Sequence, residues 1–575
     1  MPHLALPALT GFLRQRGYDV VQRDLNVELF DEVLTRRHVR NSVERIRSRF
    51  GVGASQHPLP HGRPKPADVE WALHNGPALA EHVEDAKAIL RSPKFYDGET
   101  SEPAFVTFAQ ALELTSMAHF PARLEMTTFI DAGRTDSSQD LFAAARDPNI
   151  NPFYDIFRRG ILKDLKRDQP DLVGISIPTS SQILAGLTLA ALIRDAGLKC
   201  HITVGGPHVT MMRERLVEVP RIFNLIDSAV LFEGEIPLHR LLEALSSGGD
   251  LSGVPNLVYR DPDSKTRVII NPEPNFKDSR SIEEESKPDF DGLPLDRYLA
   301  PELVLPLATT HGCYYGKCAF CNVGYGSPFG YFPIPVDHIL SEVQALQEKY
   351  ACRSIFFVDE AITPRIMRQL SAALIERGSP INWTVAARFE KSLTDELLVA
   401  AARSGCRMLL YGLESASEPI MRKMLKGTEV QEMARILHTA TGLGIWNHTF
   451  FFFGFPGETI NEAQETVNFI YANQDVIHSA SPGAFLLEIY SPAYNDPAKY
   501  GIRRVITDPE RDLAIYFDFE LVSGMNEEEA NNLADRFVEQ LPDKRFGQFY
   551  MNDVVRFLYA CEINRREQLL PRWIE

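Results

Sequence analysis

The chain has 575 residues, of which 44% are hydrophobic and 24% are charged, an ordinary balance for a globular protein. That length exceeds a single hydrophobic core and predicts two to four domains. The formal net charge of −17 argues against a nucleic-acid footprint and against adsorption to an acidic membrane surface. The longest apolar runs, such as residues 449–455, have the length of a strand and are too short to cross a bilayer. We therefore expect no nucleic-acid partner and no membrane association.

The N-terminus does not resemble a signal peptide, because Pro2 and Pro7 interrupt its apolar part and no basic region precedes it. The seven cysteines are an odd number, and three of them lie within nine positions. This pattern favours a reducing compartment and a metal site over a disulfide framework. We expect a cytoplasmic protein.

Three apolar segments in the first half predict parallel strands, each followed by an amphipathic helix. They lie at 171–177, 200–206 and 227–233. Apolar runs that end in Gly, Ser or Thr and alternate with helices are typical of a doubly wound sheet. Residues 17–25 predict a further strand of this sheet, preceded by the helix-like "LTGFLRQR".

The first domain is predicted to span residues 1–275. Helical, charged and proline-containing sequence at about 31–160 indicates an inserted helical region. Residues 255–274 predict a β-hairpin. An acidic linker at 276–302 then ends the first half.

A second series of alternating strands and helices fills residues 303–500. Its strands are predicted at 303–310, 354–360, 382–388, 407–415, 447–455 and 484–491, with helices at 335–349, 364–377, 394–403, 417–440 and 460–473. Six such units predict a full or partial parallel barrel, whose reactive groups lie at the carboxyl ends of the strands. Residues 501–575 are predicted to form a mostly helical C-terminal region.

Cys313, Cys318 and Cys321 directly follow the first predicted barrel strand. The spacing C-x4-C-x2-C suits thiolates around one iron–sulfur cube or one zinc ion. A plant-type two-iron cluster uses the same spacing with a distant fourth cysteine, for which Cys352 is the candidate. Cys352 precedes the second barrel strand, however, which places it at the opposite face of a barrel. A structural zinc site needs a fourth ligand, and only His311 is near. We favour the cube, whose fourth iron would be open to a ligand.

These features resemble the radical S-adenosylmethionine (SAM) superfamily, and specifically its cobalamin-binding subgroup. In that superfamily the amino and carboxylate groups of SAM chelate the open iron of a 4Fe–4S cluster, and one-electron reduction yields a 5′-deoxyadenosyl radical. The usual spacing is C-x3-C-x2-C, with an aromatic residue before the last cysteine. Phe320 matches that aromatic residue, whereas one extra residue separates Cys313 from Cys318. The resemblance implies that Cys313, Cys318 and Cys321 ligate the cluster.

Segments at the later strand ends resemble the SAM-binding elements of the superfamily. In "YGLESAS" (411–417), Glu414 and Ser415 would hold the amino group or ribose of SAM. Arg388, which ends "NWTVAAR", would face the SAM carboxylate, since a guanidinium suits a planar anion. Alternatively, Glu414 caps a helix and Arg388 forms a surface ion pair. "FGFPGET" (453–459) resembles the segment whose backbone lies near the adenine. In this segment the expected SAM-binding residues are Gly454, Pro456, Gly457 and Glu458.

Three segments of the first half resemble successive strand ends of cobalamin-binding Rossmann-like domains. They are "DLVGISIPTSSQ", "VGGPHVT" and "LFEGE". Small residues there let a flat corrin or its nucleotide tail approach the backbone. The candidate residues are Ser176, Thr179, Gly205, Gly206, His208, Glu233 and Gly234. The alternative is an α/β domain whose glycines serve packing alone.

The D-x-H-x-x-G motif that supplies a cobalt ligand in other cobalamin proteins is absent, because none of the 15 histidines has Asp two positions before it. We therefore expect His208 to be a hydrogen-bonding loop residue, and cobalamin to bind with neither its own base nor a protein histidine below the cobalt. The resemblance normally includes a strand ahead of the helix "LTGFLRQRG". Here the chain begins almost at that helix. Either the start codon is placed too late, or the sheet lacks that edge strand.

The predicted fold class is α/β: a cobalamin-binding Rossmann-like doubly wound sheet, then a partial (β/α)6 radical SAM barrel and a helical C-terminal region. The resemblance implies an enzyme that transfers a methyl group from SAM via methylcobalamin to an unactivated carbon of a small-molecule or peptide substrate. It also implies an external one-electron reductant of the flavodoxin or ferredoxin type. Two alternatives remain. One is a non-methylating cobalamin enzyme that performs cyclisation, ring contraction or oxidation, and the other is a non-catalytic iron–sulfur or cobalamin-binding protein, against which the SAM segments argue.

Overall fold

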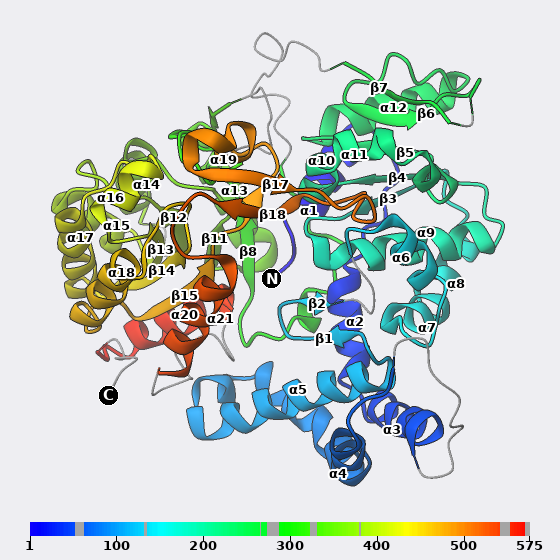
Figure 1. The fold of residues 1–575 in the computed structure, drawn as a ribbon, viewed down its shortest axis with the longest axis horizontal. Helices are drawn as coiled ribbons and strands as arrows, with labels where there is room; N and C mark the ends of the chain where they lie inside the picture. The colour runs from blue at the N-terminus through cyan, green and yellow to red at the C-terminus, as the bar shows by residue number, and fades with distance from the viewer. Residues whose placement is uncertain are drawn as a thin grey trace. The chain divides into compact units, whose positions relative to one another are not determined.

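A computed structural model describes residues 1–51, 62–130, 135–264, 266–272, 287–322, 330–378, 381–540 and 552–569. The chain divides into two compact units, both drawn in Figure 1. The sheet unit contains residues 5–301 and 508–515, and the barrel unit contains residues 1–4, 302–507 and 516–575. Residues 276–286 of the predicted linker lie outside the described residues. No described helix is both long and apolar enough to cross a membrane.

The sheet unit contains a five-stranded sheet in the order β3-β4-β5-β6-β7. Its strands are β3 (Leu172–Ser176), β4 (His201–Gly205), β5 (Ser228–Val230), β6 (Leu257–Arg260) and β7 (Val268–Ile270). The first three are parallel, as their continuous apolar runs predict, and β6 and β7 form the predicted antiparallel hairpin. The connecting helices are α9 (Ile183–Asp195), α10 (Pro207–Met211), α11 (Arg213–Glu218) and α12 (Glu235–Ser247).

One core of this unit joins α1 (Ala5–Gln15) and α12 to the sheet. Phe12 of α1 and Leu241 of α12 are fully buried in one cluster with Leu257 of β6. Burying apolar side chains of this size stabilises the unit by about 1.5–3 kcal/mol each. Because α1 packs on the sheet, it lies where the sequence pattern expects a helix of a doubly wound domain.

The strand predicted at residues 17–25 is wrong. This stretch contains no strand, and β3 is the edge of the sheet. Side-chain hydrogen bonds hold it instead: Arg14 donates to the Val20 carbonyl (2.6 Å), and the Gln22 side-chain amide donates to the Asp289 carbonyl (2.7 Å). Asp24 then accepts from the first amides of the next helix. An extended segment that is held by side-chain hydrogen bonds has the same sequence pattern as a strand, so the pattern alone does not separate the two.

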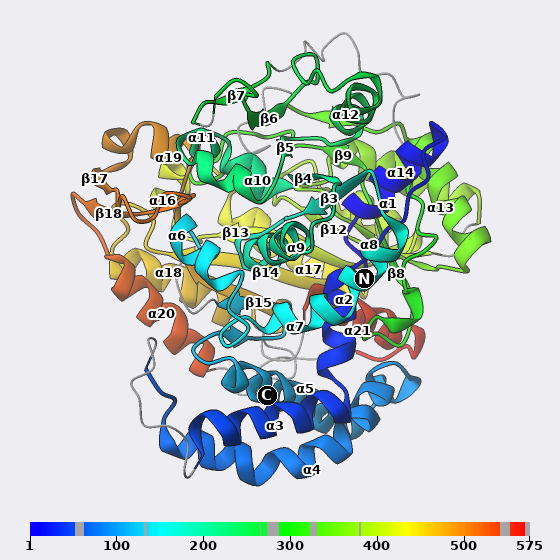
Figure 2. The same ribbon diagram turned by 90° about the vertical axis from the view of Figure 1, so that its right-hand side faces the viewer.

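Helices fill most of the region predicted as a helical insertion. They are α2 (Leu25–Val33), α3 (Arg36–Phe50), α4 (Pro66–Leu90), α5 (Gly98–Ala118), α6 (Ser138–Ala144), α7 (Pro152–Arg159) and α8 (Ile161–Asp168), with a short hairpin of β1 (Arg123–Leu124) and β2 (Phe129–Ile130). The longest three, α3, α4 and α5, lie side by side (Figure 2). In α3, Val39, Val43 and Ile46 are buried at helical spacing, so this helix packs through one apolar stripe.

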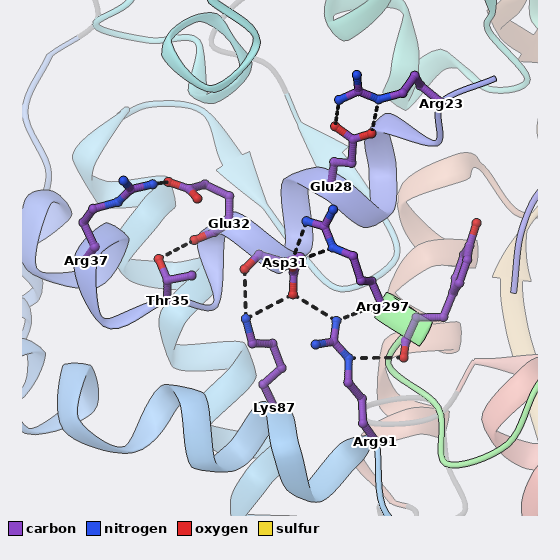
Figure 3. Close-up of polar contacts among 10 residues, drawn as sticks. Arg23, Glu28, Asp31, Glu32, Thr35, Arg37, Lys87, Arg91 and Arg297 are labelled. Carbon is purple, nitrogen blue, oxygen red and sulfur yellow. Dashed lines mark hydrogen bonds and ion pairs between the residues drawn. The ribbon is translucent and has the colours of Figure 1, made fainter. Parts of the chain in front are cut away.

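A carboxylate with three cationic partners connects α2, α4 and residue 297 within the sheet unit. Asp31 accepts from Lys87 Nζ (3.1 Å), Arg91 Nη2 (3.0 Å) and Arg297 Nε (2.8 Å), as Figure 3 shows. Burial raises the pKa of Asp31, but the hydrogen bonds from these three cations outweigh it and hold the pKa at about 2. The charged form of Asp31 therefore stabilises the fold.

Asp31→Asn is expected to lower the free energy of unfolding of the sheet unit by about 2 kcal/mol at pH 7, because it leaves three half-buried cations without their carboxylate. The folded-state pKa is below the unfolded value of about 3.9. The stabilisation is thus complete above about pH 4 and is lost as the pH falls toward 2. Urea unfolding at pH 7 measures the difference. Glu32→Gln is the control, since the Glu32–Arg37 pair is more exposed and its loss should cost under about 0.5 kcal/mol. Equal effects of the two substitutions would contradict the prediction.

The barrel unit contains a six-stranded parallel sheet in the order β15-β14-β13-β12-β11-β8. The strands are β8 (Val304–Leu307), β11 (Ser354–Phe357), β12 (Asn382–Ala387), β13 (Cys406–Glu414), β14 (Trp446–Phe453) and β15 (Ser479–Ala484). The helices are α13 (Val336–Tyr350), α14 (Pro364–Glu376), α15 (Asp395–Arg403), α16 (Glu418–Lys423), α17 (Val430–Gly442) and α18 (Ile460–Ala472). Six parallel strands in chain order make the predicted partial barrel.

The last barrel strand begins earlier than predicted. It is β15, whereas the predicted segment 484–491 contributes β16 (Leu487–Glu488) to a different sheet. Pro482 and Gly483 conceal β15 in the sequence, because both residues are unfavourable in strands. They are tolerated here because β15 is an edge strand, where a missing N–H costs no ladder bond on the open side.

The C-terminal region contains α20 (Glu527–Glu539) and α21 (Asp553–Arg565), as the helical pattern predicts. It also contains β17 (Ile502–Ile506) and β18 (Tyr516–Leu521), which form an antiparallel sheet with β16. The remaining short elements are β9 (Thr310–His311), β10 (Phe332–Pro333) and α19 (Pro492–Asn495). The predicted α/β fold class is confirmed.

Candidate functional site

The three clustered cysteines lie on the loop that follows β8 and β9. All three are free thiols; Cys318 is buried, and Cys313 and Cys321 are half-buried. The loop is fixed by its backbone, because the Ala319 amide donates to the Met424 carbonyl at 2.8 Å. The cysteines are therefore at the carboxyl end of the barrel strands, as predicted. Residues 323–326 of the surrounding motif lie outside the described residues.

Arg388 follows β12 and connects this loop to the segment after α16. Its guanidinium lies 3.6 Å from the ring centre of Tyr315, and its Nη1 is 3.7 Å from Cys318 Sγ. Its Nη2 donates to the Lys426 carbonyl. Arg388 is only 6% exposed. The structure thus places Arg388 beside a cluster cysteine and not in a surface ion pair.

Glu414 ends β13 next to a buried lysine that the sequence analysis did not identify. Lys426 Nζ lies 2.8 Å from Glu414 Oε1, and the two side chains are 6% and 13% exposed. Lys426 Nζ also lies 5.8 Å from the ring centre of Phe320. A Cβ on Gly412 would lie 2.3 Å from Glu414 Oε1 and 2.7 Å from Lys426 Nζ, so a larger residue there would displace the charged ends of this pair. Glu414 has a positive φ of 60°, a strained conformation typical of functional positions.

The donor set fits an anionic thiolate-bound cluster. Burial raises the pKa of the Cys318 thiol, and Lys426 and Arg388 oppose that rise. Burial likewise raises the pKa of Cys321. A buried thiolate needs nearby positive charge, which these two cations provide. Among the described residues, no three His, Cys, Asp or Glu side chains are arranged to hold a single metal ion.

Cys352 lies at the other end of the barrel strands. It is 1% exposed and precedes β11, whose first residue pairs with the first residue of β8. Its sulfur is 3.3 Å from the Ser354 carbonyl and 3.6 Å from the Leu303 carbonyl. The cysteine loop follows the opposite end of β8, so the structure does not bring Cys352 to the other three cysteines.

The segment after β14 forms a tight loop around a buried carboxylate. Glu458 is fully buried, and its Oε2 accepts from the Gly454 amide at 2.6 Å. Burial raises the pKa of Glu458 to about 7, against backbone hydrogen bonds from Gly454 and Phe455. Gly454 and Gly457 have φ values of 83° and 82°, which favour glycine. Pro456 lies between them. The buried carboxylate of Glu458 therefore holds the backbone of this loop in its conformation.

Ser415 is fully buried, and its hydroxyl already has protein partners. It lies 3.2 Å from the Thr466 hydroxyl and accepts from the Ser417 amide at 3.1 Å. The side chain of Ser415 thus connects the end of β13 to α18.

In the sheet unit, four candidate residues meet where β3 and β4 end. Ser176 pairs in register with Gly205, and Gly206 and His208 follow directly. Gly206 has φ 107° and ψ 170°, a conformation close to glycine-only, and a Cβ there would lie 2.8 Å from the Ile177 carbonyl oxygen. Ser176 Oγ and His208 Nε2 are buried polar atoms without a hydrogen-bond partner in the described part of the chain. Buried polar atoms of this kind are available to bind a ligand or water.

His208 is neutral near pH 7, because burial lowers its pKa to about 4. The other candidates lie further out. Thr179 is exposed three residues beyond β3, where its hydroxyl is 3.4 Å from Gln182 Oε1. Glu233 and Gly234 follow β5. A Cβ added to Gly234 would lie 3.1 Å from the side chain of Leu9. The backbone of this loop is tied to α10 by a hydrogen bond from the Phe232 amide to Thr210 (2.8 Å).

Residues 307–470 match the family model of the radical SAM superfamily. A protein of Pyrococcus horikoshii, "Uncharacterized methyltransferase PH0819", is 30% identical over 344 residues, which are 58% of this chain and 72% of that protein. The chain belongs to the radical SAM superfamily. The predicted membership is confirmed.

Two further proteins are similar to this radical SAM protein. "4'-phospho-dehydrooxetanocin synthase" of Priestia megaterium is 25% identical over 312 residues, 50% of this chain and 40% of that protein. The solved structure of the radical SAM methyltransferase TsrM from Kitasatospora setae, with cobalamin and a [4Fe-4S] cluster bound, shares the fold with a TM-score of 0.55 at 16% identity. That similarity covers 72% of this chain and 92% of TsrM.

Two carboxylates near the cysteine loop were also missed. Glu360 lies shortly after the end of β11, and Glu488 lies on β16. Burial raises the pKa of both carboxyl groups, and that of Glu488 is about 7. The Asn322 amide donates to Glu488, and the Asn322 side chain is 7% exposed without a partner in the described part of the chain. In the sequence these residues lack a distinctive motif, since single carboxylates usually occur on solvated surfaces. Only the fold brings them beside Cys321.

Proposed function

We propose that the protein is a cobalamin-dependent radical SAM methyltransferase that acts on an unactivated carbon of a small molecule or peptide. The observation that carries this proposal is the combination of two sites on one chain. The barrel unit presents three free thiols beside two buried cations, and the sheet unit presents a glycine edge with unpartnered polar atoms. The name of the relative from Pyrococcus horikoshii supports methyl transfer.

In the barrel unit, Cys313, Cys318 and Cys321 would hold a 4Fe–4S cluster, and Arg388 keeps the loop in place through Tyr315. Glu414 would bind the ammonium of SAM. The loop of Gly454, Pro456, Gly457 and Glu458 would lie along the adenine, held in its conformation by the hydrogen bond of Glu458 to Gly454. Ser415 would contact SAM through its backbone, because its hydroxyl already has protein partners. When bound, the cluster and SAM supply a radical that removes hydrogen from carbon, and cobalamin supplies the methyl group.

In the sheet unit, Gly205 and Gly206 would let cobalamin approach the backbone closely. Ser176 Oγ and neutral His208 Nε2 would hydrogen-bond to it, and Thr179, Glu233 and Gly234 would line the same edge. This assignment keeps His208 away from the cobalt, so spectra of the bound cobalamin should show no nitrogen coordination from the protein.

Methyl transfer would require two electrons from outside the chain in each turnover, one for the cleavage of SAM and one to return the cobalamin to the state that accepts a methyl group. We propose a flavodoxin- or ferredoxin-type donor.

One observation favours a second candidate. The relative from Priestia megaterium is named as a synthase and not as a methyltransferase. A non-methylating cobalamin-dependent radical SAM reaction, such as a cyclisation, ring contraction or oxidation, would use the same residues in both units.

One experiment distinguishes methyl transfer from the non-methylating reaction. The reconstituted protein is incubated with methyl-deuterated SAM, cobalamin, a reductant and a metabolite extract. Methyl transfer predicts a product that gains the labelled methyl group, with S-adenosylhomocysteine and 5′-deoxyadenosine formed in comparable amounts, so that two SAM are consumed per product. Formation of 5′-deoxyadenosine without any labelled product would support the second candidate. If neither nucleoside product forms, although the cluster is loaded, both candidates fail. The Cys318→Ala variant gives the background.

A further inference from the structure

The parallel sheet of the barrel unit has two faces, and the C-terminal helix α21 lies against one of them. On β14, the Asn447 side chain donates to a backbone carbonyl of α17 (2.9 Å), and the ring of Phe451 packs on α20. Side chains alternate along a strand, so His448 and Phe450 point to the opposite face, called the inner face here. This inner face meets α21, since His448 Nε2 lies 4.0 Å from Asp553 Oδ1.

Polar side chains gather on the inner face, in the amino-terminal half of the strands. His448 Nδ1 lies 2.7 Å from Ser479 Oγ, and His448 Nε2 lies 3.2 Å from Ser481 Oγ. On α21, Asp553 Oδ1 accepts a hydrogen bond from Arg556 Nη1 at 2.8 Å. These residues, called the polar cluster, join β14 and β15 to α21.

Two buried polar atoms at the polar cluster have no hydrogen-bond partner among the described residues. They are Nε of Arg556, a residue that is 4% exposed, and Oγ1 of Thr384, a fully buried residue of β12. Thr384 pairs in register with Phe356, whose ring packs on Phe557 of α21, so Thr384 belongs to the inner face. Both atoms are therefore available to bind a ligand or water.

Several inner-face residues in the strands stay half-buried. They are Phe356, Ala386, Phe450 and Ser481. In contrast, Val385 and Phe451 of the opposite face are 0% and 2% exposed. The Asp553 side chain is 36% exposed, although that of its partner Arg556 is 4% exposed. Solvent therefore reaches the inner face and the carboxylate of the polar cluster.

The charges of the polar cluster cancel. Burial raises the pKa of Asp553 and lowers the pKa of Arg556, and each of the two charges opposes the shift of the other. Burial also lowers the pKa of His448 well below its usual value, so this ring is neutral. A charged ligand group would add an uncompensated charge to a buried site. An uncharged group with a donor and an acceptor avoids that cost, because Asp553 can accept from it and Arg556 Nε can donate to it.

The polar cluster lies on the same sheet as the residue that would bind the SAM ammonium. Leu410 of β13 pairs with His448 and precedes Glu414 by four residues, which is a rise of about 13 Å along a strand. A ligand that extends from Glu414 to the polar cluster is therefore elongated. Its apolar part would contact the half-buried rings of Phe356 and Phe450.

We propose that the inner face binds the far end of an elongated substrate through an uncharged polar group, such as a hydroxyl or a carboxamide, which Asp553 and Arg556 recognise. This inference rests on the proposed function, because it takes the ligand to be the substrate that reacts at the carboxyl end of the sheet. It assigns substrate specificity to α21, which lies outside the residues 307–470 that match the family model.

Fluorine NMR on the cluster-loaded full-length protein tests this inference with probes that share a fluorophenyl ring and differ in charge. They are 4-fluorobenzamide, which is uncharged, 4-fluorobenzylamine, which is a cation at pH 7, and 4-fluorobenzoate, which is an anion. Wild type should bind the amide about tenfold more tightly than either charged probe, the size expected of one charge-assisted hydrogen bond left without its counterpart.

Two substitutions should change this preference in opposite directions. Asp553→Asn leaves the Arg556 guanidinium unpaired, so 4-fluorobenzoate should become the probe that binds most tightly. Arg556→Met leaves the Asp553 carboxylate unpaired, so 4-fluorobenzylamine should then bind most tightly. A general loss of structure would weaken the binding of all probes alike. If one variant does not fold, the other still tests the inference.

Asp155→Asn is the matched control, because Asp155 and Arg158 form the same kind of pair, three residues apart, in a more exposed helix. Its order of probe affinities should match that of wild type. Formation of 5′-deoxyadenosine from SAM and a reductant is measured on the same samples. Switches in both variants without SAM cleavage by wild type would contradict the proposed function and leave the binding site. SAM cleavage by a wild type that binds the three probes equally, or an unchanged order of affinities in both variants, would overturn this inference alone.

Discussion

Replacing Cys313, Cys318 or Cys321 with alanine is expected to reduce bound iron to background and to abolish SAM cleavage. Three thiolates on one short loop provide all the protein ligands of the proposed cube, and two cannot hold it against loss to solvent. The neighbouring Arg388 would then lie beside a site without its anion. Iron analysis, the visible absorption of the reconstituted protein and 5′-deoxyadenosine formation measure the effect.

Cys352→Ala is the control for that experiment. Its sulfur lies 3.6 Å from the Leu303 carbonyl and 3.3 Å from the Ser354 carbonyl, at the far end of the strands. The substitution should cost about 1 kcal/mol of stability and leave iron content within the error of wild type. Loss of iron in Cys352→Ala would favour the two-iron cluster with Cys352 as fourth ligand.

The sequence predicts the barrel well where its strands are fully buried. The strands up to β14 are mostly buried, and three of them, β12, β13 and β14, end at or next to the candidate residues Arg388, Glu414 and Gly454. The pattern fails at β15, because an edge strand tolerates Pro482 and Gly483, which a periodicity argument excludes. It also fails at residues 17–25, which hydrogen bonds from the side chains of Arg14 and Gln22 hold without strand pairing.

The candidate sites are predictable only where a motif marks them. The cysteines and the glycines of the 453–459 loop are visible as patterns, because their spacing resembles that of the cofactor-binding segments of the superfamily. Lys426 has no such pattern: a lysine after a short helix is normally solvated, and its buried partner Glu414 lies in another segment. Likewise, the unpartnered atoms of Ser176 and His208 exist only in the folded sheet.

Gly206→Ala is expected to abolish cobalamin binding while leaving the iron–sulfur cluster in place. The backbone of Gly206 has φ 107° and ψ 170°, which an alanine does not adopt without strain of about 1–3 kcal/mol. The new Cβ would also lie 2.8 Å from the Ile177 carbonyl oxygen, so the loop between β4 and α10 must move. That movement displaces His208 and the edge that β3 and β4 share. Cobalamin retained after gel filtration, measured by its visible absorption per chain, should fall at least tenfold, whereas iron per chain stays unchanged.

Gly197→Ala separates a local effect from general destabilisation. Gly197 also has a positive φ, of 72°, but apart from its chain neighbours no atom of the described residues lies within 4 Å of the position of its Cβ, and it follows α9 at the opposite end of the strands. Its substitution should cost about 1 kcal/mol of stability, as alanine in a left-handed conformation does, and leave cobalamin binding intact. If Gly206→Ala retained cobalamin as well as Gly197→Ala does, the carboxyl edge of β3 and β4 would not be the cobalamin site. If both variants lost cobalamin and unfolded at the same lower urea concentration, the loss would reflect stability. Only loss in Gly206→Ala alone, with its iron retained, places the cofactor at that edge, because both substitutions strain a positive-φ backbone but only the methyl group added at Gly206 meets the Ile177 carbonyl.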